Sequence, residues 1–110
     1  MTLARSSAVV LLCTTPTPIV AHRMARQLVS RHLAACVSCL PGARSYFWWQ
    51  GRVDQARETV LVIKTTRRRL AATMRAIRTT HPYTVPELIA LPIVAGSRAY
   101  LTWLQKACRG

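Results

Sequence analysis

The residues best suited to chemistry lie in one short stretch, His81–Glu87 (HPYTVPE). An imidazole, a phenol and a carboxylate fall within this stretch, together with two prolines that exclude a helix and remove two backbone donors. Glu87 stands out because the whole chain has only three acidic residues. Rigid loops with clustered polar groups are common places for binding and catalysis. The sequence therefore predicts a site on a stiff, extended loop at residues 81–87.

Cys13 is a second candidate, because it ends the apolar segment Ala8–Cys13, which reads as a central strand. In the topology predicted below, the end of this strand and the end of the second helix meet at one edge of the sheet, which places Cys13 near His81. A thiol and an imidazole suit a soft or borderline metal ion such as copper. The alternative is a buried apolar cysteine beside a hydrogen-bonded histidine. Two ligands do not complete a metal site, so a third would come from water, the backbone or another chain.

Two other patterns give little support for catalysis or metal binding. Asp54 and Glu58, four positions apart on a predicted strand, would lie roughly 13 Å from each other, whereas hydrolytic carboxylate pairs need about 5 to 9.5 Å. Cys36 and Cys39 have the spacing of a zinc knuckle or redox pair, but residues three apart on a strand point to opposite faces. No phosphate-cradling glycine loop and no serine elbow is present. The sequence therefore predicts a protein that is not an enzyme.

The elements that would position these residues alternate between strands and helices. Thr17-Pro18 supplies a cap and a first-turn proline for a helix ending near His32. The next segments form a long hairpin over 35–49 and 53–65, bent at Pro41-Gly42 and turning at Gln50-Gly51. A second helix at 67–79, a strand at 88–94 and a last helix after Gly96-Ser97 follow. Pro92 lacks an N–H, so the strand at 88–94 is expected at an edge or with a bulge.

This order, βαββαβ with an extra C-terminal helix, predicts an α+β, ferredoxin-like fold with one layer of helices on an antiparallel sheet. The 110 residues suffice for a single domain, 1–110, in which residues 1–7 are expected to be flexible. The hairpin is too long for so small a core and should protrude. Burial against another subunit is then expected for the aromatic residues at its tip, Tyr46, Phe47, Trp48 and Trp49.

The net charge of +13, from 16 Lys and Arg against three acidic residues, favours contact with a polyanion, although solvated Arg-rich helix faces are an alternative. The predicted first and third strands lack the stacking aromatics of RNA-binding sheets, so nucleic-acid contact is expected to be salt-sensitive and non-specific. The longest apolar run, Ala8–Cys13, is far too short to span a membrane. Four cysteines without other signs of secretion favour reduced thiols and the cytoplasm.

Several motifs, in order over about residues 8–104, carry a family resemblance. They are Val10–Pro16 (VLLCTTP), Leu33–Val37 (LAACV), Leu40–Gly42 (LPG), Trp49–Gly51 (WQG), Leu61–Thr65 (LVIKT), His81–Glu87, Leu91–Gly96 (LPIVAG) and Tyr100–Trp103 (YLTW). Together they resemble the CutA divalent-cation tolerance proteins. The resemblance implies a ferredoxin-like protomer in a tight homotrimer whose hairpins wrap onto neighbouring subunits. It also implies a role in tolerance to copper and other divalent metals, without a settled enzymatic activity.

The resemblance also implies two sets of site residues. In bacterial members a copper site is ascribed to the strand-one cysteine and a His-His pair, which corresponds here to Cys13 and His81, with Thr80 at the first His position. A second cluster, in a cleft between subunits, corresponds to Cys36, Lys64, Tyr83 and Glu87.

The predicted function is therefore that of a trimeric, CutA-like protein that binds copper or other divalent cations in metal ion homeostasis. The alternative is a trimeric small-ligand sensor or adaptor that binds an anion or a partner peptide in the inter-subunit cleft. For Lys64, a side chain that merely extends past the rim of the sheet is a further alternative. A trimer would carry three times the +13 of one chain, whereas the family members resembled are acidic or balanced. Such self-repulsion must be offset by anions or a polyanionic partner.

Overall fold

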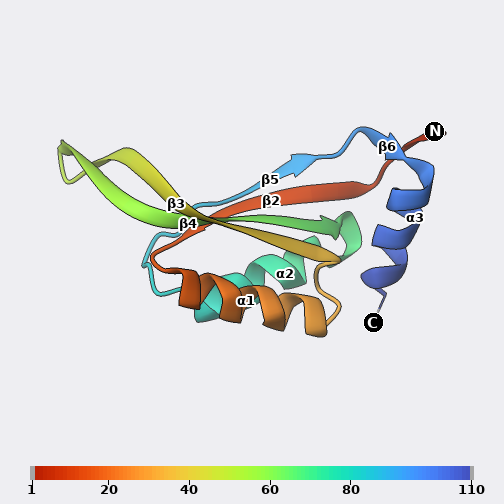
Figure 1. The fold of residues 1–110 in the computed structure, drawn as a ribbon, viewed down its shortest axis with the longest axis horizontal. Coiled ribbons are helices and arrows are strands. Elements are labelled where there is room, and N and C mark those ends of the chain that lie inside the picture. Colours follow the sequence, from red (N-terminus) through yellow and green to blue (C-terminus); the bar gives the residue numbers. More distant parts are fainter. Residues whose placement is uncertain (1, 110) are drawn as a thin grey trace.

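A four-stranded antiparallel sheet organises the chain, of which the computed structural model describes residues 2–109. Its order is β3-β4-β2-β5, and the strands are β2 (Ala8–Thr15), β3 (Cys36–Trp49), β4 (Arg52–Thr66) and β5 (Leu88–Pro92). The helices α1 (Pro18–Ser30) and α2 (Arg67–Thr80) lie along one face of this sheet, and α3 (Arg98–Ala107) stands at its end (Figure 1). The predicted α+β, ferredoxin-like order with an extra helix is confirmed.

Side-chain caps fix where the three helices begin. The Thr17 hydroxyl accepts a hydrogen bond from the Val20 N–H, with Pro18 in the first turn of α1. Thr66 caps α2 and Ser97 caps α3 in the same way. Such caps satisfy N–H groups that have no partner inside the helix. The starts of α1 and α3 that the sequence predicts at Thr17-Pro18 and Gly96-Ser97 are therefore confirmed.

The main core lies between the sheet and the two helices α1 and α2. Side chains alternate across a strand, so the odd-numbered residues of β2 from Val9 onward, and those of β4 from Thr59 onward, face the helices and are buried. The largest apolar members of this core are Leu11, Met24, Leu28, Leu33, Leu61, Ile63 and Ile77. A second cluster, around Leu101 and Leu104, attaches α3 to the end of the sheet.

The hairpin of β3 and β4 extends well beyond the helices (Figure 1). Its register shifts between Leu40 and Ala43, where Gly42 has a positive φ, so the predicted bend at Pro41-Gly42 is a β-bulge. Gln50 and Gly51 both have positive φ, as a tight hairpin turn requires. The described residues span 46 × 25 × 22 Å, and the hairpin forms the long end. The predicted protrusion is confirmed.

The N-terminal segment differs from the prediction of a flexible stretch over residues 1–7. Leu3–Arg5 forms a short strand, β1, which pairs antiparallel with β6 (Ala95–Ser97); residue 1 lies outside the described residues. Ile93 still donates to the Ala8 carbonyl oxygen after Pro92, and the chain then runs beside the N-terminal segment. The strand predicted over 88–94 is therefore shorter, β5 at Leu88–Pro92, and it is at the sheet edge as expected, whereas β6 lies outside that prediction.

Candidate functional site

His81 is held in place by hydrogen bonds to both of its ring nitrogens. It follows α2 directly and is only 8% exposed. Its Nδ1 accepts a hydrogen bond from the Tyr83 backbone N–H at 3.1 Å. Its Nε2 lies 2.8 Å from the Thr14 carbonyl oxygen and therefore carries the proton that it donates there. The ring thus ties the start of the 81–87 loop to the end of β2.

The Cys13 side chain lies close to the same Thr14 carbonyl oxygen. Its side chain is fully buried, and its Sγ lies 3.8 Å from the Thr14 oxygen. The thiol and the His81 imidazole therefore both lie at the end of β2, with Sγ and Nε2 no farther apart than the sum of their distances to that oxygen. Burial, together with the carboxylates of Glu87 and Glu58, raises the pKa of Cys13 to about 12. The thiol is therefore protonated at neutral pH.

These groups give an incomplete metal site within one protomer. A single metal ion needs its sulfur and nitrogen donors within about 4 Å of each other, a thiolate rather than a thiol, and a free ring nitrogen. Residues 2–109 contain no group of three or more His, Cys, Asp and Glu side chains able to hold an ion. The Thr80 hydroxyl, at the position of the family's first His, donates to the Ala76 carbonyl of its own helix. One protomer therefore offers at most two donors, Cys13 and His81.

Tyr83 forms a hydrogen bond with Glu58, a residue that was not among the predicted site residues. Its hydroxyl donates a 2.9 Å hydrogen bond to Oε2 of Glu58, which is only 6% exposed. Burial and this bond raise the pKa of Tyr83 to about 12. In the sequence, Glu58 stands out only as a carboxylate directly before the buried half of its strand, Thr59–Thr66. Glu87, on the same loop as Tyr83, is exposed.

Cys36 and Lys64 form a separate pair at the other end of the sheet. They are directly opposite each other in the β3–β4 ladder, so their side chains share a face. The Lys64 Nζ lies 5.8 Å from the centre of the Tyr100 ring. Lys64 is six positions along β4 from Glu58, roughly 20 Å at about 3.3 Å per residue. One protomer therefore does not bring the four predicted cleft residues together, and Cys36 and Lys64 would need a neighbour to approach Tyr83 and Glu87.

The face of the sheet opposite the helices, called the open sheet face below, is apolar. Its side chains come from all four strands: Val10, Leu12, Leu40, Val60, Val62, Ile89 and Leu91. In the protomer, Leu40, Ile89 and Leu91 are each about half exposed. The aromatic hairpin tip is also uncovered, with Trp48 75% exposed. Continuous exposed apolar surface of this kind marks an interaction surface.

Residues 9–107 match the family described as CutA1 divalent ion tolerance protein. The chain belongs to this family. It is 43% identical over 102 residues, 93% of each chain, to the divalent-cation tolerance protein CutA of Pectobacterium atrosepticum. It also resembles the crystal structure of CutA from Xylella fastidiosa, with a TM-score of 0.92 and 36% identity over 94% of this chain and all of that one. The prediction of a member of the CutA divalent-cation tolerance family is confirmed.

The comparisons also bear on location. A solved relative, with a TM-score of 0.90, 31% identity and coverage of 93% of this chain and 99% of the other, is the periplasmic divalent cation tolerance protein CutA of Archaeoglobus fulgidus. Among residues 2–109 no helix is long and apolar enough to cross a membrane. The sequence predicts a cytoplasmic protein, whereas this relative is named as periplasmic.

Proposed function

We propose that this chain is a homotrimeric divalent-cation tolerance protein that binds copper or another divalent metal ion in metal ion homeostasis, in the cytoplasm. The observation that supports binding most directly is the approach of the Cys13 thiol and the His81 imidazole to one backbone carbonyl. A sulfur and an aromatic nitrogen are donors that suit copper and zinc. The relatives' shared name, divalent-cation tolerance protein, agrees with this chemistry.

Cys13 and His81 would hold the ion, and the site would be completed from outside the protomer by water or a second chain. Binding by Cys13 requires release of the thiol proton, and the burial that raises the pKa of this thiol opposes that release. His81 would have to exchange one of its two hydrogen bonds for the metal. We therefore expect affinity to be modest at neutral pH and to increase as the pH rises.

Trimer formation is supported by the two apolar surfaces of the protomer. The open sheet face has no helix over it, and the aromatic hairpin tip projects from the body (Figure 1). Closed symmetric assembly removes both kinds of surface from water at once. In such an assembly, the Cys36–Lys64 end of one open sheet face would lie beside the Tyr83–Glu87 end of the next.

Copper titration of the protein and three variants tests the metal site. We expect Cys13→Ser and His81→Ala each to weaken copper affinity at least about tenfold, because each removes one of two donors. Cys39→Ser is the control, since Cys39 is also a strand thiol, although only partly buried, and it lies on β3 and not on β2. Unchanged affinity in both Cys13→Ser and His81→Ala would remove this site.

A second candidate function is a small-ligand sensor or adaptor that uses the inter-subunit cleft. It is favoured by the opposite charges of Lys64 and Glu87, which lie at different ends of one protomer and would meet only between subunits. An anion or a partner peptide would bind there without a metal. A ligand that raises the melting temperature in the presence of a chelator would favour this function over metal binding.

Non-specific polyanion contact follows from the charge of the whole chain. Sixteen basic residues against three acidic ones attract any polyanion, and the attraction weakens as salt screens it. Nucleic-acid binding that persisted at high salt would contradict this purely electrostatic account.

A further inference from the structure

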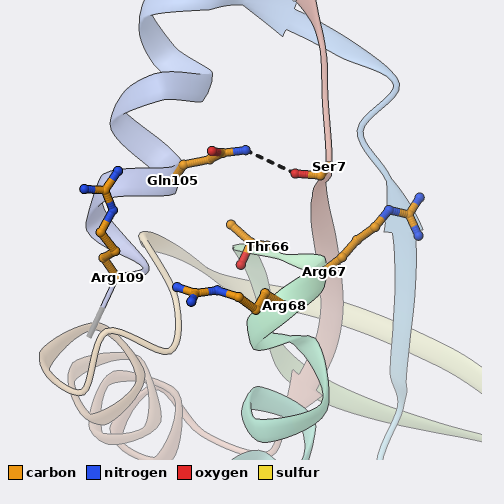
Figure 2. A pocket seen from close by; sticks show the side chains of 6 residues that line it. All are labelled: Ser7, Thr66, Arg67, Arg68, Gln105 and Arg109. Atoms are coloured by element: carbon orange, nitrogen blue, oxygen red, sulfur yellow. Dashed lines mark hydrogen bonds between the residues drawn. The ribbon is translucent and has the colours of Figure 1, made fainter.

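A cavity lined by arginines lies between the beginning of α2 and the end of α3, far from Cys13 and His81. Its volume is about 540 Å³. The residues that line it come from three parts of the chain, as Figure 2 shows: Ser7, Thr66, Arg67, Arg68, Gln105 and Arg109. The side chain of Arg68 points from α2 toward α3, whereas Arg67 extends to the other side.

No Asp or Glu side chain lies near these guanidinium groups. The three acidic residues are Asp54, Glu58 and Glu87. Glu58 is eight positions along β4 from Thr66, roughly 26 Å away. Glu87 directly precedes Leu88, which pairs with Cys13, roughly 20 Å along β2 from Ser7. All three acidic side chains thus lie toward the hairpin end, and no Asp or Glu side chain stands among the arginines of the cavity.

Hydrogen bonds hold the walls of the cavity in place. The Arg69 Nε donates to the Cys108 carbonyl oxygen at 2.8 Å, which ties the first turn of α2 to the end of α3. The Gln105 amide donates to the Ser7 hydroxyl at 3.1 Å, as drawn in Figure 2. The Arg67 N–H donates to the Ser7 carbonyl oxygen. These contacts position Arg68 and Arg109 on facing elements before any ligand arrives.

The distribution of charge in α2 is unfavourable without an anion. Its first turn holds three arginines, Arg67 to Arg69, and no acidic residue. The amino end of a helix carries a partial positive charge, so cations there are repelled and anions are attracted. The arginine at the end of α3 adds a further positive charge from a separate element. An anion in the cavity would relieve the repulsion at the start of α2.

We propose that this cavity binds a small anion that carries two or more phosphate groups. Guanidinium groups form paired, charge-assisted hydrogen bonds with phosphate oxygens, and two such groups are offered by Arg68 in α2 and by Arg109 just after α3. The volume lies within the range of about 300 to 1,000 Å³ typical of small-molecule sites and exceeds the size of one phosphate. No aromatic residue lines the cavity, so it offers no platform for stacking a base. The phosphates, rather than a nucleobase, would provide the recognition.

This site is independent of the metal proposal, because it lies at the opposite end of β2 from Cys13. It also lies beside the helices and not on the open sheet face, so assembly through that face would leave it accessible. A variant that no longer binds copper should therefore still bind an anion in the cavity, and failure to bind an anion would say nothing against the metal site.

Calorimetric titration with pyrophosphate and with orthophosphate, at constant near-physiological ionic strength, tests the proposal. We expect one saturable pyrophosphate site per protomer and at least about tenfold weaker orthophosphate binding, because a single phosphate cannot engage both arginines. Arg68→Gln and Arg109→Gln should each weaken pyrophosphate binding about ten- to hundredfold. Arg68→Lys, which keeps the charge but loses the paired geometry, should show an intermediate loss.

Arg78→Gln is the matched control. Arg78 is exposed on the same helix, about 15 Å from Arg68 along the axis, and its loss changes the net charge equally. Melting curves of all variants check that they are folded, which is expected because Arg68 and Arg109 are exposed. If Arg78→Gln weakened pyrophosphate binding as much as Arg68→Gln does, the binding would reflect general attraction to a basic surface. That result would overturn the proposed site. Tighter binding of a duplex oligonucleotide than of pyrophosphate, dependent on Arg68, would overturn it in favour of nucleic acid.

Discussion

The hydrogen bond between Tyr83 and Glu58 gives the sharpest test of the site geometry. Tyr83→Phe removes only the hydroxyl that donates to Oε2 of Glu58 and leaves the ring, and its tilted contact with His81 at 4.9 Å, in place. Glu58 is only 6% exposed, so water cannot easily replace the lost donor. The substitution therefore isolates one contact between the loop and the hairpin.

The expected loss is about 1.5 to 3 kcal/mol in the free energy of unfolding, the usual contribution of a hydrogen bond to a charged group. No cavity is created, so packing adds little. If Glu58 is first replaced by Met, which has a similar shape but no carboxylate, Tyr83→Phe should cost less than about 0.5 kcal/mol, because the hydroxyl then has no acceptor to lose.

Urea denaturation of the four proteins of this cycle, at one fixed protomer concentration, measures the coupling. Tyr46→Phe is the control, since it makes the same chemical change at the exposed hairpin tip and should alter stability by less than about 0.5 kcal/mol. An equal cost for Tyr83→Phe with Glu58 and with Met at position 58 would refute the contact as the source of the stability.

Three further predictions concern stability and assembly. The pKa of the Cys13 thiol is raised from 9.0 to about 12 in the folded protein, so as the pH rises the thiol ionises first in the unfolded chain. The contribution of the folded, protonated thiol to stability is therefore complete below pH 9 and decreases between pH 9 and pH 12. Urea denaturation at several pH values should show that the free energy of unfolding decreases less with pH in Cys13→Ala than in the unmodified protein, by up to about 1.4 kcal/mol per pH unit. The same dependence of stability on pH in both proteins would contradict this prediction. Thr65→Val should destabilise by about 1 to 2 kcal/mol in the same assay, because it removes the 2.6 Å hydrogen bond to the buried Leu33 carbonyl group; no loss would mean that the Thr73 hydroxyl, which donates to the same oxygen at 2.9 Å, suffices. Ile89→Lys, on the open sheet face, should give the mass of a single protomer in light scattering, whereas Val29→Lys, on the outside of α1, should not; an intact trimer with Ile89→Lys would place the interface elsewhere.

The predictable parts of this fold depend on local chemistry. A threonine before a proline specifies the start of α1, and a Pro-Gly pair specifies the bulge in β3, whatever the rest of the chain does. The meeting of Cys13 and His81 is less local, yet it follows from strand order alone, because the topology brings both chain segments to one edge of the sheet.

The features that the sequence does not reveal depend on long-range detail. The hydrogen bond between Tyr83 and Glu58 depends on the path of the 81–87 loop. The spacing of apolar residues in the sequence does not predict that path. The pairing of β1 with β6 involves strands of three residues, too short for alternation to be recognised. The excess of arginine is visible in the composition, but its convergence on one cavity requires the α2–α3 contact made by Arg69.

Native mass spectrometry of the untagged protein, purified from cells grown with copper, tests the central claim most directly. Each chain has a mass of 12.3 kDa. The account predicts a species of three chains that carries copper or another divalent ion. A folded, metal-free single chain would contradict both the assembly and the function proposed for it.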